Sequence, residues 1–167
     1  MHLNILSKEQ IELLPLISKF KREFYLVGGT AIALHLGHRE SIDFDLFKLA
    51  NLRKSDIYRK VISSKFSYKF GYENYEQLNL IINDVKFTYF SFPHKIPATS
   101  ELKGVIKMPD LLTLAAMKAF ALVRRAKWKD YLDLYFILKD HFSFQEIANQ
   151  AKLLFGEQFS ENYSKCN

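Results

Sequence analysis

The chain has 167 residues, the size of one domain or of a compact catalytic core with a helical extension. Hydrophobic residues make up 49% of it, with 15 Phe and 9 Tyr, so it can bury a sizeable core. The net charge of +6 suits an ordinary solvated surface as well as one that attracts nucleotides or RNA, so charge alone does not choose between them. A single cysteine, Cys166, excludes an internal disulfide framework and a multi-cysteine zinc site.

The N-terminal stretch MHLNILSKEQIELL carries charges where a signal peptide needs an uninterrupted apolar run. No segment approaches the roughly 18 apolar residues of a membrane span. One cysteine also fits a reducing compartment. We therefore expect a soluble, cytoplasmic protein without a membrane partner.

The first elements are a helix and a short strand. Ser7 is expected to cap a helix, with Gln10 as its partner in a capping box and apolar residues spaced along one stripe. Residues 24–27 (FYLV) form an apolar run that suits a buried strand, and the run stops at Gly28 and Gly29, where the backbone must turn tightly.

A short helix and a second strand follow the glycines. Residues 30–36 have a helix-like apolar stripe, and Gly37 is a natural C-cap. From Ser41 the period changes to two, so that one strand face carries Ile42, Phe44 and Leu46 and the other carries Asp43, Asp45 and Phe47. The two aspartates then lie on one face, about 6.6 Å apart at roughly 3.3 Å of rise per residue.

The remaining elements are a helix, a strand, a hairpin, a proline-rich connector and three helices. Their expected positions are a helix at 56–64 capped by Ser55, a strand within 66–75, a hairpin of 78–82 and 85–92 around Asn83-Asp84, a connector at 93–109 with a short strand at 105–106, a helix from Pro109, a helix at 129–139, and a helix capped by Ser143 that runs to about 154.

The aspartate pair and the glycine turn indicate one kind of chemistry. Two carboxylates on one strand face repel each other unless a cation lies between them. Hard oxygen ligands beside an open loop suit Mg²⁺, which takes one or two carboxylates together with phosphate oxygens of a substrate. A Gly-Gly turn that opens a helix presents bare backbone N–H groups and a positive helix end, which bind phosphate.

These residues resemble a known family. The ordered set G-G-T followed by H-R-x-S-x-D-F-D-L-F, within YLVGGTAIALHLGHRESIDFDLF, is similar to the motif of the AbiEii/AbiGii toxin-type nucleotidyltransferases of the DNA polymerase β-like superfamily. The resemblance implies an α/β (α+β) fold, with a small mixed β-sheet flanked by helices and a C-terminal helical bundle. It also implies Mg²⁺ (or Mn²⁺) at Asp43 and Asp45 and a nucleotide cradle at Gly28, Gly29 and Thr30.

A second block extends the resemblance. PDLLTLAAMKAFALVRRAKWKDYLDLYFIL is similar to the family pattern of an Asp before a helix that bears a Lys, followed by R-x-x-x-K-D-x-x-D. It places the pattern on Asp110, Lys118, Arg125, Lys129, Asp130 and Asp133. By resemblance Lys118 meets the triphosphate, although a lysine on an apolar helix face also snorkels to solvent or pairs with a carboxylate such as Asp133. The last four residues either form a structural ion-pair network or line the cleft, and the sequence favours neither.

The chain departs from the superfamily at one position. Superfamily catalysis uses a third carboxylate on a neighbouring strand, and Thr88 stands where that acid is expected. A threonine hydroxyl is a poor metal ligand and no base near neutral pH. Asp84 is a poor substitute because its expected place is the hairpin turn, about 13 Å along the strand from Thr88. Three alternatives stay open: an acid from elsewhere, proton transfer assisted by the substrate, or weakened activity.

Four further residues are of interest near the site. His35 and His38 are three residues apart on the short helix, and without a third ligand we expect surface packing rather than metal binding. Arg39 and His38 are placed to touch a phosphate or a base. Ser41 is expected to shape the approach to the aspartate strand.

We therefore expect a nucleotidyltransferase core at 1–95 and a helical region at 96–167 that closes the cleft. The expected reaction moves an NMP from an NTP to a hydroxyl, and the resemblance implies a tRNA-like RNA or a protein as acceptor, a toxin role and a cognate antitoxin. The rival hypothesis is an NTP- or RNA-binding module that has lost turnover through Thr88. A metal-dependent hydrolase is less suited, since the Gly-Gly turn and Lys118 fit an intact triphosphate.

Overall fold

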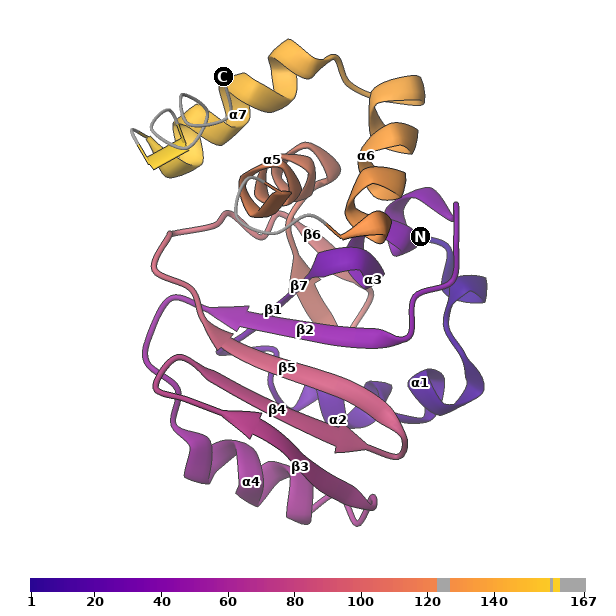
Figure 1. Cartoon of the computed structure of the whole chain (residues 1–167). Helices are drawn as coiled ribbons and strands as arrows, with labels where there is room; N and C mark the ends of the chain where they lie inside the picture. The colour runs from indigo at the N-terminus through magenta and orange to yellow at the C-terminus, as the bar shows by residue number, and fades with distance from the viewer. Residues whose placement is uncertain (123–126, 157, 160–167) are drawn as a thin grey trace.

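The computed structural model describes residues 1–122, 127–156 and 158–159. A five-stranded mixed sheet in the order β1-β2-β5-β4-β3 forms its centre, and β2 and β5 are the parallel pair (Figure 1). The strands are β1 (Tyr25–Val27), β2 (Asp43–Lys48), β3 (Tyr68–Glu73), β4 (Gln77–Ile82) and β5 (Val85–Ser91), with β6 (Ser100–Leu102) and β7 (Ile106–Met108) in a separate antiparallel pair.

Short helices precede the sheet, two helices lie between its strands in the chain, and longer helices follow it. They are the 3₁₀ turn η1 (Leu3–Ile5) and the α-helices α1 (Lys8–Glu12), α2 (Leu14–Ser18), α3 (Gly28–Leu36), α4 (Lys54–Ile62), α5 (Leu111–Leu122), α6 (Trp128–Asp140) and α7 (Phe144–Phe155). None of these described helices is long and apolar enough to cross a bilayer.

Several local predictions are confirmed by the caps and turns. Ser7 and Gln10 form the capping box of α1, and Gly37 ends α3 with a left-handed φ of 70°. Asn83 and Asp84 both have positive φ, 49° and 62°, as a two-residue hairpin turn requires. Each of these signals is carried by adjacent residues, so the sequence contains all the information needed.

Three predictions about elements are wrong in detail. The first helix is divided into α1 and α2, and Pro15 lies in the first turn of α2, where its missing N–H breaks no helical bond. The helix α4 begins at Lys54 and its N-cap is Arg53, so Ser55 lies inside the helix and is not its cap. Ile42 is exposed because it precedes β2 at the open end of the strand.

Alternation along β2 gives the sheet two different faces. Phe44 and Leu46 are fully buried on one face, where they pack with residues of β4, β5 and α2 in the main core. Asp43, Asp45 and Phe47 are half-buried on the other face, as period two predicts. The apolar face secures the strand, and the opposite face is left free to carry polar groups.

The C-terminal helices gather at the β1–β2 edge of the sheet, and β4 and β3 lie at the opposite edge, away from them (Figure 1). Asp110 caps α5, because its Oδ1 accepts a hydrogen bond of 2.8 Å from the Thr113 N–H. Ser143 and Glu146 form the predicted capping box of α7. Leu114, Ile137 and Ile147 belong to the same buried cluster as the sheet residues, so the helices and the sheet share one core.

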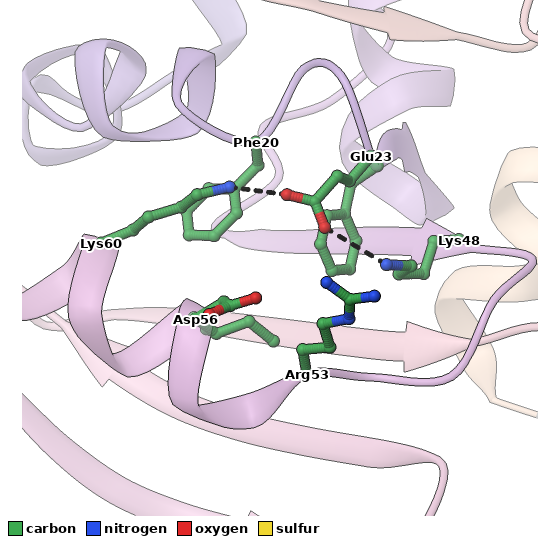
Figure 2. Close-up of a pocket in the computed structure, with 8 residues that line it drawn as sticks. Phe20, Glu23, Lys48, Arg53, Asp56 and Lys60 are labelled. Carbon is green, nitrogen blue, oxygen red and sulfur yellow. Dashed lines mark hydrogen bonds and ion pairs between the residues drawn. The ribbon is translucent and has the colours of Figure 1, made fainter.

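A polar cluster lies on the side of the sheet opposite the aspartates, between the segment that follows α2, the end of β2 and α4 (Figure 2). Glu23 bridges Lys60 at 2.8 Å and Lys48 at 3.3 Å. The Lys48 ammonium also lies 5.2 Å from the centre of the Phe24 ring, and that of Lys60 lies 4.9 Å from the Phe20 ring. These groups satisfy one another, so the cluster ties elements together and leaves no room for a ligand.

Candidate active site

A cleft of about 430 Å³ lies over the face of the sheet that carries the aspartates. Its floor is formed by β2 and β5, and its walls by the start of α3, by α5 and by the start of α6. The polar residues that line it are Asp43, Asp45, Gln77, Lys86, Thr88, Lys118, Lys127 and Asp130. The two aspartates therefore face a space large enough for a small ligand.

The two carboxylates lack the partners that usually hold buried acids. Neither Asp43 nor Asp45 lies within ion-pair distance of a cationic side chain of the described residues. Burial raises the pKa of Asp45, and the charge of Asp43 raises it further, against a hydrogen bond from Thr88 and the positive charge of Lys118. The pair thus has the unmet negative charge that a divalent cation would balance, and its oxygen donors suit Mg²⁺.

Thr88 occupies the place next to Asp45 that the sequence indicated. The parallel register of β2 and β5 pairs Asp45 with Thr88 and Asp43 with Lys86. Asp84 lies in the hairpin turn before β5, as expected. Over the described residues no group of three His, Cys, Asp or Glu side chains is arranged to hold a metal, so the aspartates act as a pair.

The glycine turn is forced by its neighbours. Gly28 has a φ of +75°, and a Cβ atom there would overlap the carboxyl group of Asp45. A Cβ atom on Gly29 would overlap the Arg39 guanidinium. The helix α3 begins directly at Gly28 and has no side-chain cap at its N-terminus. Its first N–H groups and the positive end of its dipole therefore lie beside the aspartates.

Thr30 and Ser41 join the start of α3 to the start of β2. The Thr30 hydroxyl is buried and lies 2.9 Å from Ser41 Oγ, and it also donates to the backbone oxygen of Asp43. Both side chains are absent from the cleft lining. Their hydrogen bonds fix the distance between the glycine turn and the acid strand.

Lys118 pairs with Asp133, the alternative partner that the sequence offered, and also with Asp130. Its ammonium lies 2.8 Å from Asp130 Oδ1 and 3.0 Å from Asp133 Oδ2. Lys118 and Asp130 both line the cleft, so this pairing holds the ammonium at the cleft wall. The second oxygen of Asp130, Oδ2, is buried without a hydrogen-bond partner in the described part of the chain.

Asp133 is the centre of the network behind that wall. Arg39 donates two hydrogen bonds to it, from Nε at 2.7 Å and from Nη2 at 3.0 Å, and His38 Nε2 lies 2.8 Å from Oδ1. Burial alone raises the pKa of Asp133, but the Arg39 hydrogen bond and the Lys118 charge outweigh it and hold the pKa below its ordinary value. Asp133 therefore stays ionised and connects α6 to the loop after α3.

Two expectations about the histidines are corrected by this network. The His38 side chain is only 3% exposed and packs against Phe136, so it is not a surface residue. His35 is half-buried, and its Nε2 lies 3.1 Å from the backbone oxygen of Pro109. Both rings are covered because α5 and α6 pack over the short helix, a contact between segments far apart in the sequence.

The predicted site residues fall into four groups. Gly28, Asp43, Asp45, Lys118 and Asp130 line the cleft, whereas Gly29, Thr30, Arg39, Ser41 and Asp133 lie behind its wall. Lys129 is exposed outside the lining. Arg125 lies outside the described residues. The roles assigned to all of them stay predictions.

An aromatic wall and two lysines of the cleft were not predicted from the sequence. Phe47, Phe90 and Phe92 line the cleft with ring centres 5.1, 5.4 and 6.2 Å apart, and Lys86 and Lys127 line it too. Period two along β5 was the available signal, since Lys86 and Phe90 lie two residues on either side of Thr88 and so share its face. Phe92 follows the end of β5, so strand periodicity could not indicate that it lines the cleft.

Comparison with solved structures defines the class of fold. The chain is similar to a putative nucleotidyltransferase from H. pylori, with a TM-score of 0.59 and 19% identity over 98% of this chain and 78% of that one. It is also similar to the antibiotic-resistance factor ANT(2'')-Ia, with a TM-score of 0.63 and 12% identity over 93% and 92% of the two chains. MenT4, a nucleotidyltransferase toxin of Mycobacterium tuberculosis, matches with a TM-score of 0.54 and 13% identity over 86% of this chain and 62% of that one. The expected nucleotidyltransferase fold is thus confirmed.

The family assignment comes from the sequence. The family model for the nucleotidyl transferase AbiEii toxin of type IV toxin–antitoxin systems matches residues 16–166, so the chain belongs to this family and is a nucleotidyltransferase. An uncharacterized protein of Aquifex aeolicus is 30% identical over 143 residues, which cover 81% of this chain and 68% of the relative. The resemblance carried by the two sequence motifs is confirmed.

Proposed function

We propose that the protein is a Mg²⁺-dependent nucleotidyltransferase that moves an NMP from an NTP to a hydroxyl of a tRNA-like RNA or a protein. The observation that carries the proposal is the pair Asp43 and Asp45, which share one strand face, line the cleft beside Gly28 and lack a cationic partner among the described residues. By family, we further propose that it is the toxin of a cytoplasmic toxin–antitoxin pair and has a cognate antitoxin.

The residues around the pair each have a place in this reaction. Asp43 and Asp45 would hold Mg²⁺, which supplies positive charge to the phosphates of the NTP in the transition state. The first N–H groups of α3, exposed by Gly28, would bind triphosphate oxygens. Lys118 would offset the remaining charge, and Asp130 and Asp133 hold its ammonium in place for that contact.

The transfer itself forms one bond and breaks one. The acceptor oxygen attacks the α-phosphorus of the NTP as the bond to the pyrophosphate oxygen breaks, with the two oxygens in line. Thr88 is no base, and Asp130 already accepts from Lys118, so we propose that the hydroxyl proton passes to a phosphate oxygen of the substrate. The products are the nucleotidylated acceptor and pyrophosphate.

Label transfer tests the proposal. Each of the four α-labelled NTPs is offered with Mg²⁺ to the wild type and to the variant Asp43→Ala/Asp45→Ala, with total RNA and the protein itself as acceptors. Label in RNA or protein from the wild type alone supports the proposal and identifies both nucleotide and acceptor. Label from neither protein contradicts it. Growth inhibition that survives Asp43→Ala would refute the role as a catalytic toxin.

The position of Thr88 favours one alternative, a binding module with weakened turnover on the same fold. Its side chain lies beside Asp45, where superfamily relatives by resemblance carry an acid. The variant Thr88→Asp separates the two. If Thr88→Asp transfers far faster than the wild type with unchanged NTP affinity, the binding module is supported. If the wild type transfers as fast as Thr88→Asp, the enzyme is supported.

A further inference from the structure

The sheet face that carries the aspartates continues beyond the cleft onto β4 and β3, which none of the described helices covers on this side (Figure 1). Directly paired residues of neighbouring strands point to the same face. The register pairs Asp45 with Thr88, Thr88 with Asn79 and Asn79 with Tyr72. A second row of paired residues starts two positions earlier on β2. In this row Asp43 pairs with Lys86, Lys86 with Ile81 and Ile81 with Lys69.

These residues make an exposed surface, which we call the open strand face: Lys69, Tyr72, Gln77, Asn79, Ile81 and Lys86. Lys69, Tyr72, Ile81 and Lys86 are exposed, and the two amides are half-buried. The C-terminal helices lie at the other edge of the sheet (Figure 1). At about 4.8 Å per strand, the face extends about 14 Å from Asp43 to Lys69.

We propose that the acceptor is the end of a single RNA strand that lies along the open strand face, an inference that rests on the proposed transfer reaction. The side from which the acceptor approaches follows from in-line geometry, because the attacking oxygen and the leaving pyrophosphate lie on opposite sides of the α-phosphorus. The glycine turn follows β1, and β1 flanks β2 on the side away from β5. A triphosphate held at that turn leaves the side of β5, β4 and β3 for the acceptor.

The charge of the face fits a polyanion. Neither Lys69 nor Lys86 lies within ion-pair distance of a carboxylate in the described part of the chain, so both ammonium groups are available to phosphates. A lysine on the edge strand β3 also discourages pairing with another chain. That explanation does not extend to Lys86, because β5 is a central strand.

The uncharged residues suit nucleotide bases. Tyr72 is 50% exposed, and base stacking on an aromatic side chain contributes about 1–3 kcal/mol per base. Gln77 Nε2 donates to Asn79 Oδ1 at 2.8 Å, which leaves the Asn79 amide donors and the Gln77 oxygen for base edges. A protein acceptor would gain little from two unpaired lysines, whereas a nucleic acid would use the lysines, the tyrosine and the amides of this face.

Two charge-matched variants test the inference. Lys69→Glu/Lys86→Glu and the control Lys103→Glu/Lys107→Glu each lower the net charge by four, from +6 to +2, and both control lysines are exposed on the β6–β7 hairpin. Binding of labelled single-stranded RNA and of tRNA is measured by anisotropy, and label transfer from the NTP is measured beside it. We expect at least 10-fold weaker binding and transfer with the first variant and less than a 3-fold change with the control. NTP affinity should be unchanged in the control and in Lys69→Glu alone, because Lys86 lines the cleft beside Asp43 and Lys69 does not.

The salt dependence of RNA binding, and a variant at Trp128 on a different surface, test the inference further. With Lys69→Ala/Lys86→Ala, a variant that carries no added repulsion, the slope of log K against log salt should fall by about 1.4 for a single strand if each lysine meets a phosphate. Tyr72→Ala should weaken binding without changing this slope. Trp128→Ala, at the exposed start of α6, should leave binding unchanged.

The outcomes separate this inference from the proposed function. Equal loss in the two charge variants, or loss with Trp128→Ala alone, overturns the inference because the RNA then lies elsewhere. Label found in protein and not in RNA overturns it while the transferase stands. RNA binding that depends on Lys69 and Lys86 without any transfer by the wild type supports the surface and refutes the reaction.

Discussion

Asp133 shows how a buried charge organises this site. Its carboxylate is fully buried and accepts hydrogen bonds from Arg39 at both oxygens, while Lys118 lies 3.0 Å from Oδ2. Two cations, Arg39 and Lys118, meet two anions, Asp133 and Asp130, so a balanced network holds the Lys118 ammonium at the cleft wall. We infer that Asp133 is a positioning residue that holds Lys118 ready for the triphosphate without touching the nucleotide.

The variant Asp133→Asn should lower both stability and turnover. Loss of the charge leaves Arg39 and Lys118 largely buried without their shared partner, which costs about 3–5 kcal/mol. Chemical denaturation checks the stability, and transfer kinetics should show a rise in the KM for NTP. Asp140→Asn, on the exposed end of the same helix, is the control and should change neither.

The pH dependence of the wild type should report the same group. The folded pKa of Asp133 is below its ordinary value of 3.8, so its stabilisation is present above that pH and is lost as the pH falls below it. In Asp133→Asn the difference in stability from the wild type should therefore shrink on acidification below about pH 4. A difference that stays constant to pH 2 would contradict an ionised Asp133.

At the scale of elements, the turn from β1 into α3 brings the backbone against the acid strand. Gly28 has a left-handed φ and lies where a Cβ atom would overlap the Asp45 carboxyl group. Strand pairing of Val27 with Asp45 fixes this approach. The bare helix N-terminus is therefore placed beside the aspartates by the fold itself.

Gly28→Ala should abolish transfer, and Gly104 offers a matched control. Both glycines have a φ of +75°, so alanine costs about 1–2 kcal/mol at either position, but a Cβ atom on Gly104 meets nothing within 4 Å. We expect only this backbone cost in thermal unfolding of Gly104→Ala, a larger loss in Gly28→Ala because the Asp45 carboxyl must shift, and at least 100-fold lower transfer only in Gly28→Ala. Equal transfer by the two variants would show that the contact with Asp45 is not needed.

The same scale explains which features the sequence could predict. The aspartate face of β2, the Asn83-Asp84 hairpin and the Ser143 cap depend on neighbouring residues, so period and turn chemistry were sufficient. The hydrogen bond from Arg39 to Asp133 joins residues 94 positions apart. Periodicity holds no information about such a contact, so the sequence left Asp133 between a structural and a cleft role.

At the scale of the whole molecule, a shared hydrophobic core joins the helical region to the sheet, in addition to the contacts at the site. Ile137 of α6 and Leu114 of α5 belong to the same buried cluster as Leu26 and Phe44 of the sheet. A core that continues across both parts favours a single cooperative unit. The division expected from the sequence, 1–95 and 96–167, is thus proposed to be one of function and not of folding.

Adjacent residues of α6 test this. Ile137 is fully buried and Leu138 is 42% exposed, so Ile137→Ala should cost about 2–5 kcal/mol and Leu138→Ala much less. In a chain of this size each kcal/mol lowers Tm by roughly 2–4 °C. Because the core is shared, Ile137→Ala should shift the far-ultraviolet transition of the whole molecule and the near-ultraviolet signal of the sheet aromatics by the same amount. Two separate transitions, with the sheet signal unmoved, would show that the helical region folds independently, and the cleft would then lie between two units that are free to move.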